Sequence, residues 1–400
     1  MINFTAWPEM LAWPYLILKG WLPYRDIAIA HNPLLILILT GFYKIVGVGI
    51  MQLKIFTWGL IIVNSYLTYF VAKKYWSNKV GYVSGFLYII LCIIYQGNGL
   101  WFDLALTPFA LLLYLFIREK RYLYAGLIFG LGFLTKQTFI YFLIPILLSK
   151  INVKKFLLGI APVFVVFTLY LFTNNLISSY YDWAIKFGIL YLPNAVGQVS
   201  LPSIKSFLFA VVPFSLLIIN FEFAPWVLAG ALGVYSRWEL FHFQPALPFL
   251  AIAISILLFS NRSKILKVII GSLLVAYLSM GTYRNLGETT RFFESDVQEV
   301  SSLITSHQPA ITSLYVINYW DNIYALTNTL PNKPLIPYIP WYLNYNNNKQ
   351  KILDGLKLNM PEVVVIGEKD INFVDVYDFV DKFYNCKVVE KQVELCEKNK

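Results

Sequence analysis

Residues 21–35 read WLPYRDIAIAHNPLL, and a long series of apolar segments of bilayer length follows them. The stretch carries an acid, Asp26, and runs through His31 into a turn at Pro33. A carboxylate placed at a membrane surface suggests chemistry on a lipid-borne substrate.

The composition of the whole chain excludes a soluble globular protein. Of 400 residues, 58% are hydrophobic and only 14% are charged, and the mean hydropathy is +0.61. This is more apolar surface than one soluble core can bury. The net charge is +10, but Lys and Arg form short clusters between apolar runs, so we expect membrane lipid and no nucleic acid as partners.

The apolar segments predict an all-α membrane domain over residues 1–281. A hydrocarbon core of ~30 Å needs about 20 residues of helix. The candidate spans are residues 53–72, 80–95, 100–117, 156–172, 207–220, 245–259 and 265–280. Two short helices at 122–134 and 138–148, separated by Lys136, and the stretch 224–235 bring the number to about ten.

Clusters of basic residues orient this domain, because cytoplasmic loops carry an excess of Lys and Arg. The clusters are Lys73, Lys74 and Lys79; Arg118, Lys120 and Arg121; Lys150, Lys154 and Lys155; and Arg262, Lys264 and Lys267. Placing them in the cytoplasm puts the loop 96–103 and the long loop 174–206 outside. The last span then ends outside, near Gly281.

The apolar stretch 33–48 decides whether the acids of the first two outer loops share one face. If it crossed the bilayer, Asp26 and Asp103 would lie on opposite sides. If it lies along the outer interface as a juxtamembrane helix, they lie on the same side. We favour the second arrangement. The opening MINFTAWPEM has no signal-peptide pattern, so whether the N-terminus is complete stays open.

Residues 282–400 predict a small α/β domain on the extracytoplasmic side. Helical spacing at 288–305 and 349–358 alternates with apolar strands at 314–317 and 363–366. The stretch 331–348, PNKPLIPYIPWYLNYNNN, predicts a loop that could cover the membrane mouth of a site. Cys386 and Cys396 would form a disulfide if this end faces an oxidising compartment.

Four pieces of residues 1–281 together resemble the integral-membrane glycosyltransferases of the GT-C fold. The branch in question is similar to dolichyl-phosphate-mannose protein mannosyltransferases and lipid A aminoarabinose transferases. The pieces are the first acid-bearing loop ending in HNPLL, the stretch WFDLALTPF, the stretch GLGFLTKQT, and the stretch RWELFHFQPALPFLAI. The chain departs from the family in having Pro8-Glu9 for a paired acid motif and His31-Asn32 before the proline turn.

The resemblance implies transfer of a sugar from a polyprenyl phosphate or diphosphate to an envelope acceptor, which is a protein, a lipid or a glycan. The transfer takes place at the outer face of the plasma membrane, with inversion. It requires a carboxylate base. Glu9 is the first candidate, and Asp26 is the second, although an ion pair with Arg25 would also explain Asp26. Asp103 would position the acceptor or assist the base, or it caps a helix.

The same resemblance requires cations that neutralise the leaving phosphate. Lys136 interrupts an apolar run, where a charge costs about 2.5–3.5 kcal/mol, so it needs either a lipid phosphate or an internal carboxylate such as Asp103. Arg237 and His242 are further phosphate-binding candidates, and His31 is a weaker one. A pairing of Arg237 with Glu239 is the plain alternative.

No cluster of residues has metal-ligand spacing and no nucleotide-binding glycine loop appears, so we predict no cofactor beyond the lipid-linked sugar. A divalent metal is left open. The alternative function is a transporter or flippase of lipid-linked saccharides. Against it, the ionisable residues gather toward one face and no internal repeat is evident. A structural or assembly role is a third reading, but it leaves Lys136 unexplained.

Overall fold

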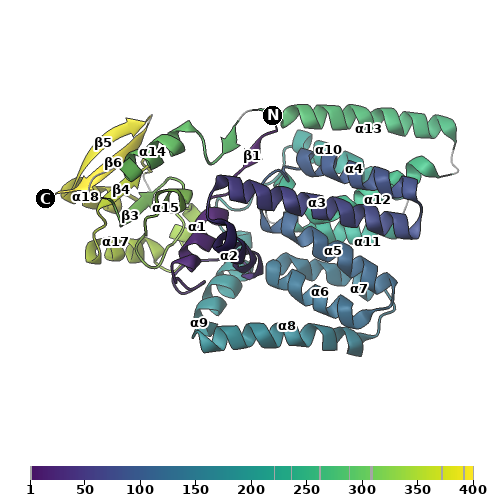
Figure 1. The fold of residues 1–400 in the computed structure, drawn as a ribbon, viewed down its shortest axis with the longest axis horizontal. Helices are drawn as coiled ribbons and strands as arrows, with labels where there is room; N and C mark the ends of the chain where they lie inside the picture. The colour runs from purple at the N-terminus through teal and green to yellow at the C-terminus, as the bar shows by residue number, and fades with distance from the viewer. Residues whose placement is uncertain are drawn as a thin grey trace.

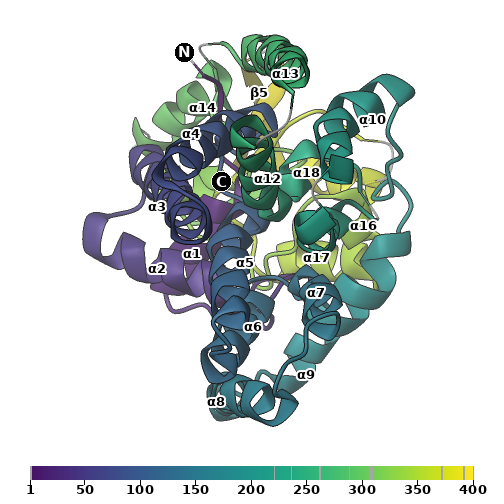
Figure 2. The same ribbon diagram turned by 90° about the vertical axis from the view of Figure 1, so that its right-hand side faces the viewer.

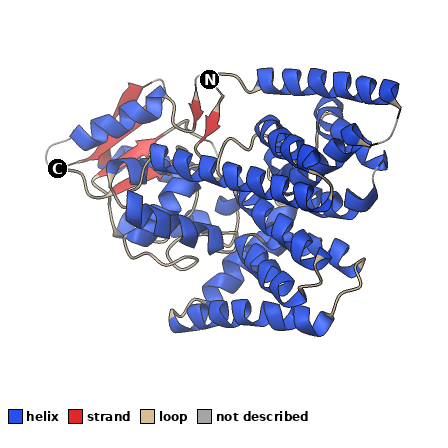
Figure 3. Ribbon diagram, turned by 45° about the vertical axis from the view of Figure 1, so that its right-hand side comes forward, coloured by secondary structure: helices blue, strands red, loops and turns tan. Residues whose placement is uncertain are grey.

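The computed structural model describes residues 2–399, except for 220, 236, 261, 262, 288, 307–309, 371, 372 and 391. A helical body occupies one end of the molecule and a small sheet with its helices the other (Figures 1 and 3). Arg262 of the fourth basic cluster and Glu288 of the first predicted C-terminal helix lie outside the described residues.

The helical body follows the predicted spans closely. Its elements are α3 (Ile50–Tyr75), α4 (Asn78–Ile94), α5 (Phe102–Arg118), α6 (Tyr122–Thr135), η1 (Gln137–Phe142), α7 (Leu143–Leu147), α8 (Val153–Thr173), α10 (Ile204–Val211), η4 (Val212–Ile219), η5 (Phe221–Phe223), α11 (Ala224–Ala231), η6 (Leu232–Val234), η7 (Leu240–Ala246), α12 (Leu247–Phe259) and α13 (Lys264–Arg284). Helix α5 lies in the middle of the body, against α3, α6 and η7 (Figure 2).

Three of the described helices are long and apolar enough to cross a membrane by themselves. They are Ile50–Tyr75, Val153–Thr173 and Leu240–Phe259. A fourth span results if Ile204–Leu217 and Phe221–Val234, which are bent by 118°, count as one. Several other predicted spans form shorter apolar helices, so the figure of about ten stays a prediction.

Glycines bring α6 and α8 unusually close together. A Cβ atom built on Gly126 would lie 1.9 Å from the Phe156 carbonyl oxygen, and one on Gly159 would lie 1.9 Å from the Leu123 carbonyl oxygen. No side chain fits at those distances. Small residues of this kind allow membrane helices to pack backbone against backbone.

The N-terminal segment, residues 2–49, forms a short strand and two helices. Strand β1 (Phe4–Thr5) is followed by α1 (Glu9–Leu18), which is buried along most of its length, and by α2 (Leu34–Val46), which buries one face only. The Tyr43 hydroxyl donates to the Met10 carbonyl, 3.2 Å away, and ties the two helices together. A half-buried apolar helix of this kind is compatible with the predicted interfacial location of residues 33–48.

The expectation of a long loop over residues 174–206 is wrong for its first half. The structure has α9 (Ile177–Tyr180), a π-helix η2 (Tyr181–Tyr191) and a short η3 (Leu192–Asn194) there. Tertiary contacts explain the difference, because Trp183 packs on Tyr342 and the Tyr345 hydroxyl donates to Asp182 Oδ1, 3.1 Å away. Both partners belong to the C-terminal part, which local sequence cannot indicate.

The C-terminal part is the predicted α/β unit. Its sheet has the order β3 (Leu314–Ile317), β4 (Val363–Ile366), β6 (Val393–Lys398), β5 (Tyr384–Glu390), with β3 parallel to β4 and the other pairs antiparallel. Its helices are α14 (Ser295–Ser306), α15 (Asn322–Thr327), α16 (Pro340–Leu343), α17 (Asn348–Leu358) and α18 (Val374–Phe383). The two predicted strands agree residue for residue, whereas the first helix begins seven residues later than expected, at Ser295 instead of residue 288.

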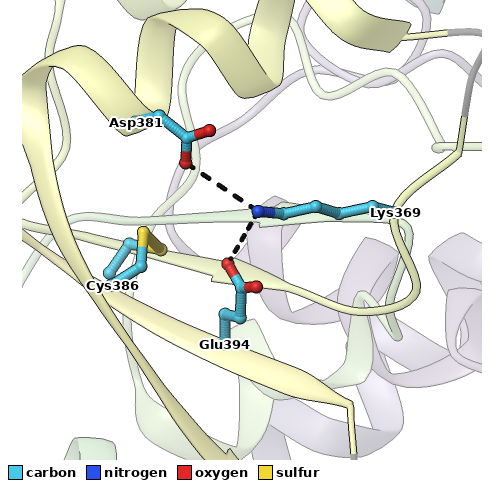
Figure 4. Close-up of a disulfide and its surroundings, with 5 residues drawn as sticks. Lys369, Asp381, Cys386 and Glu394 are labelled. Atoms are coloured by element: carbon cyan, nitrogen blue, oxygen red, sulfur yellow. Dashed lines mark ion pairs between the residues drawn. A yellow bond between two sulfur atoms is a disulfide. The ribbon is translucent and has the colours of Figure 1, made fainter.

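A disulfide joins Cys386 of β5 to Cys396 of β6, which face each other across the two strands. Beside it, Lys369 Nζ lies 3.1 Å from a Glu394 carboxylate oxygen and 3.8 Å from Asp381 Oδ1 (Figure 4). The sequence left this disulfide open, and the structure contains it.

The N-terminal segment and the C-terminal part are joined by backbone hydrogen bonds. Strand β1 pairs with β2 (Thr290–Arg291), and the Ala28 amide donates to the Leu335 carbonyl at 2.9 Å. The Leu335 amide in turn donates to the Asp26 carbonyl at 2.8 Å. The proline-rich stretch 331–348 therefore contacts the N-terminal segment.

Candidate functional site

Three predicted residues from three elements meet in a buried cluster. Asp103 lies in the first turn of α5, Lys136 at the break between α6 and η1, and His242 in η7. Asp103 Oδ2 lies 2.6 Å from Lys136 Nζ and 2.9 Å from His242 Nδ1, and these two nitrogens are 3.3 Å apart. The Asp103 side chain is 1% exposed and the Lys136 side chain 5%. We call this group the Asp103 cluster.

The carboxylate partner of Lys136 is therefore the internal one that the sequence analysis named as an alternative. Removal of one member would leave a buried charge unpaired, which is strongly unfavourable. The extended backbone of Lys136, which separates α6 from η1, aims the side chain at Asp103 and explains why the apolar run is broken at this residue.

His31, in the N-terminal segment, adjoins the Asp103 cluster. Its ring packs on Phe102, with 4.5 Å between ring centroids. Burial, together with the nearby charge of Lys136, lowers the pKa of His31 to about 3. His31 is therefore a neutral imidazole at physiological pH, and it can accept or donate one hydrogen bond without adding charge.

Glu9 lies at the start of α1 and is joined to the same region through aromatic rings. Trp7 packs on Trp101 and Phe241, with centroids 5.0 and 5.2 Å apart. Trp101 precedes Asp103 by two residues and Phe241 directly precedes His242. We call Trp7, Trp101, Phe102 and Phe241 the aromatic layer.

Glu9 differs from the other candidate acids because one of its carboxylate oxygens has no described partner. Its Oε2 atom is buried and has no hydrogen-bond partner among the described residues. Burial raises the pKa of Glu9 to about 7. A carboxylate whose pKa lies near the working pH is suited to accept a proton.

Asp26, by contrast, is held in a structural role. Its side chain is 8% exposed, and its oxygens lie 3.2 Å from Arg25 Nε and 3.2 Å from Lys333 Nζ. Asp26 Oδ2 also accepts from the Leu22 amide at 2.9 Å. The hydrogen bonds to Arg25, Leu22 and Lys333 outweigh burial and lower the pKa of Asp26. The ion pair with Arg25, which was the alternative to a catalytic role for Asp26, is present. A second ion pair, with Lys333, connects Asp26 to the C-terminal part.

Arg237 is also outside the Asp103 cluster. Its guanidinium donates to Gln198 Oε1 at 2.8 Å, lies 3.4 Å from Glu239 Oε1, and stacks 5.2 Å from the Trp341 ring centroid. The ion pair between Arg237 and Glu239, which was the alternative to phosphate binding, is present. The side chain is 32% exposed, so it remains open to a further anion.

Four buried polar atoms without a described partner belong to Glu9 or to residues within two positions of the Asp103 cluster in the sequence. Such atoms are rare in folded proteins and mark an unfilled ligand position or an ordered water. Near the site they are Glu9 Oε2, Trp101 Nε1, Thr138 Oγ1 and Gln244 Oε1. Trp101 and Thr138 adjoin the Asp103 cluster in sequence, and neither was singled out from the sequence alone.

Two further residues were missed by sequence reasoning. Gln137, next to Lys136, donates to the Ala30 carbonyl at 2.9 Å and to the Ala184 carbonyl at 3.2 Å, which joins the N-terminal segment to η2. Asp321 of the C-terminal part is buried and within electrostatic reach of Glu9. A polar residue beside an isolated buried lysine was a usable signal for Gln137, whereas nothing in the sequence indicated Asp321.

Within the described ranges, the group of potential metal ligands that lie close together is Cys386, Glu394 and Cys396. The disulfide uses both sulfur atoms, so this group offers no thiolate to an ion.

A pocket of about 650 Å³ lies elsewhere, beside α3 and α4. It is lined by Lys54, Trp58, Ile62 and Ile89 among others, and by no member of the Asp103 cluster.

Comparison with known proteins agrees with the resemblance seen in the sequence. Residues 30–177 match the family model of dolichyl-phosphate-mannose-protein mannosyltransferase. This range contains His31, Asp103 and Lys136. No curated protein sequence matches the chain.

Two solved structures share the fold over almost the whole chain. ArnT from Cupriavidus metallidurans bound to undecaprenyl phosphate has a TM-score of 0.67 at 11% identity, and the apo state of the same protein has 0.67 at 12%. Both matches cover 99% of this chain and 94% of ArnT. The chain is therefore similar in fold to a GT-C glycosyltransferase, and its apolar helices fit an integral membrane protein.

Proposed function

We propose that this chain is a membrane glycosyltransferase that moves a sugar from a polyprenyl phosphate, or diphosphate, to a hydroxyl of an envelope acceptor. The observation that carries the proposal is the buried Asp103 cluster, whose neighbours Trp101 and Phe241 pack on Trp7, two residues before Glu9, an acid with a buried and unpartnered Oε2 atom. It is supported by the family match over residues 30–177 and by the fold shared with ArnT, which was crystallised with undecaprenyl phosphate.

In the proposed reaction Glu9 is the general base. Its Oε2 atom takes the proton of the acceptor hydroxyl, whose oxygen forms a bond to the anomeric carbon. The bond from that carbon to the phosphate oxygen breaks, and its electron pair leaves with the lipid phosphate. Attack opposite the leaving group inverts the anomeric configuration.

The leaving phosphate gains negative charge, which nearby donors stabilise. Lys136 and His242 are the proposed donors, and Asp103 holds both in place. His31 and the Trp101 Nε1 group, which has no described partner, can each add a neutral hydrogen bond. Arg237 contacts Gln198, Glu239 and Trp341 instead of the Asp103 cluster. It is proposed to bind the donor at the edge of the site.

We place the site and the C-terminal part on the extracytoplasmic side of the plasma membrane. The basic clusters support this orientation through the positive-inside rule. The disulfide supports it too, because disulfides persist in oxidising compartments.

The test is cleavage of a lipid-linked sugar by the purified protein. The protein is incubated with a panel of polyprenyl-phosphate sugars and an envelope extract as acceptor, and free polyprenyl phosphate is measured. We expect release with at least one donor and none with soluble nucleotide sugars. A transporter would instead move the lipid across proteoliposomes and leave the sugar bond intact, and that result would replace this proposal.

A further inference from the structure

We infer that a separate lipid site lies between α10 and α13, in a cavity of about 590 Å³ that binds an anionic phospholipid. The phosphate of the lipid would bind Lys205 and Arg284, and one acyl chain would lie on the apolar walls next to these two cations. No member of the Asp103 cluster lines this cavity. The inference therefore does not depend on the proposed transferase function.

The charge of the cavity favours an anion. Lys205 lies in the first turn of α10, and Arg284 is the last residue of α13. Neither side chain pairs with an acid among the described residues, and the described residues that line the cavity include no Asp or Glu. Two like charges at one apolar cavity repel each other, and an anion bound between them removes this repulsion. Phosphate is an anion that Arg and Lys donors bind well.

Both walls of the cavity have the same order of side chains. On one wall, Lys205 is followed by Val212, seven residues further along the chain. On the other wall, Arg284 is preceded by Met280 and Tyr277, four and seven residues back along α13. Seven residues of helix extend about 10 Å. Each wall thus begins with a cation and continues with apolar or aromatic groups, which is the order of headgroup and chain in a phospholipid.

Contacts between the helices fix the position of the Arg284 guanidinium. It stacks on the Phe209 ring of α10, with 4.4 Å from its Cζ atom to the ring centroid. The Tyr277 hydroxyl donates to the Phe209 carbonyl at 3.1 Å, and the two rings are 5.2 Å apart. The Tyr95 hydroxyl donates to the Ala210 carbonyl at 2.6 Å and ties α10 to the end of α4 (Figure 1). Stacking uses the face of the guanidinium, so the N–H groups at its edge can bind an anion.

The exposed apolar side chains of the cavity favour a lipid over a soluble anion. Leu208, Val212 and Met280 line it, and each is more than half exposed. An acyl chain reaches these side chains directly from the bilayer, whereas inorganic phosphate has no group that would contact them. In the orientation proposed above, α13 ends on the outer side, so both cations lie at the level of the headgroups of the outer leaflet.

Melting of the purified full-length protein in detergent tests the inference, because a ligand that binds only the folded state raises the melting temperature. The probes are dioleoyl phosphatidylglycerol, dioleoyl phosphatidylcholine and inorganic phosphate. We expect saturating phosphatidylglycerol, which is anionic, to raise the melting temperature by about 2–5 °C. Phosphatidylcholine, whose headgroup has no net charge, and inorganic phosphate should each raise it by less than about 1 °C.

Variants of the cavity identify where the lipid binds. Arg284→Gln and Lys205→Gln should each raise the half-saturating concentration of phosphatidylglycerol about tenfold, the effect of one lost charge-assisted hydrogen bond. Leu208→Trp keeps both cations but fills the cavity, and it should abolish the shift. Lys264→Gln, which removes a cation from the opposite end of α13, is the matched control and should keep the native shift.

Four outcomes would overturn the inference. They are a native shift in the double variant Arg284→Gln with Lys205→Gln, a native shift in Leu208→Trp, an equal loss in Lys264→Gln, and an equal shift with inorganic phosphate. The loss in Lys264→Gln would indicate general attraction of anionic lipid to basic residues. If polyprenyl phosphate displaces phosphatidylglycerol at a lower concentration, the cavity belongs to the donor lipid and the assignment to phospholipid is wrong. None of these results bears on Glu9 as the base.

Discussion

At the residue scale, the distinction between the candidate acids comes from their partners. Asp103 is bound to Lys136 and His242, and Asp26 is bound to Arg25 and Lys333, whereas Glu9 Oε2 has no described partner. The sequence could nominate all three acids, since each interrupts an apolar context. The family resemblance ranked Glu9 first, but the sequence could not show which acids are paired, because the cations that occupy Asp103 and Asp26 come from up to 307 residues away.

Loss of Asp103 should destabilise the protein as well as inactivate it. In Asp103→Leu, Lys136 stays buried without its carboxylate, and we expect a cost of about 3–5 kcal/mol in the free energy of unfolding. The double variant Asp103→Leu with Lys136→Met removes both charges and should recover most of the stability but no activity. Melting in detergent measures the stability of the single and the double variant. A double variant as unstable as the single one would contradict the buried pairing.

His31 should make the protein acid-sensitive. Its pKa is about 3 in the folded protein, below its ordinary value of 6.5, so the unfolded state binds the proton first. Stability is then complete above pH 6.5 and falls by about 1.4 kcal/mol for each pH unit between 6.5 and 3. We expect His31→Gln to reduce this slope in melting experiments. An unchanged slope would mean that His31 is already solvated or charged.

At the element scale, the helices could be predicted and their breaks could be understood only in part. The apolar runs gave most helix positions within a few residues, as for 156–172 against α8 (Val153–Thr173). The π-helix η2 was missed, because its stability derives from Tyr342 and Tyr345 of the C-terminal part. Lys136 marked the α6–η1 break in the sequence. Its partner stayed open, because the sequence allowed either a lipid phosphate or an internal carboxylate such as Asp103.

The α6–α8 contact gives a prediction at this scale. Gly126→Ala and Gly159→Ala each place a Cβ atom 1.9 Å from a carbonyl oxygen, so the helices must separate. We expect each to lower the free energy of unfolding by about 1–3 kcal/mol. Gly271→Ala on α13, where a Cβ atom meets nothing within 4 Å, is the control and should be neutral or slightly stabilising. Equal melting temperatures for all three would contradict the close contact.

At the scale of the whole molecule, the N-terminal segment contacts both the helical body and the C-terminal part. Asn32 Nδ2 donates to the Phe133 carbonyl of α6 at 2.6 Å, while Lys333 reaches back to Asp26. The sequence predicted both parts and the strands of the second. It could not predict that the proline-rich stretch and Asp321 return to the N-terminal segment, since those contacts span about three hundred residues.

The measurement that tests the central claim most directly compares Glu9→Gln with Asp26→Asn in transfer from the active polyprenyl-phosphate sugar. We predict that Glu9→Gln loses about 10²- to 10⁴-fold in kcat with the native melting temperature at neutral pH. Asp26→Asn should melt at a lower temperature, because the Asp26 carboxylate pairs with Arg25 and Lys333. It should keep kcat within about tenfold, because in this account Asp26 does not contact the reacting groups. Native turnover in folded Glu9→Gln, or its loss in Asp26→Asn alone, would contradict the assignment of Glu9 as the base.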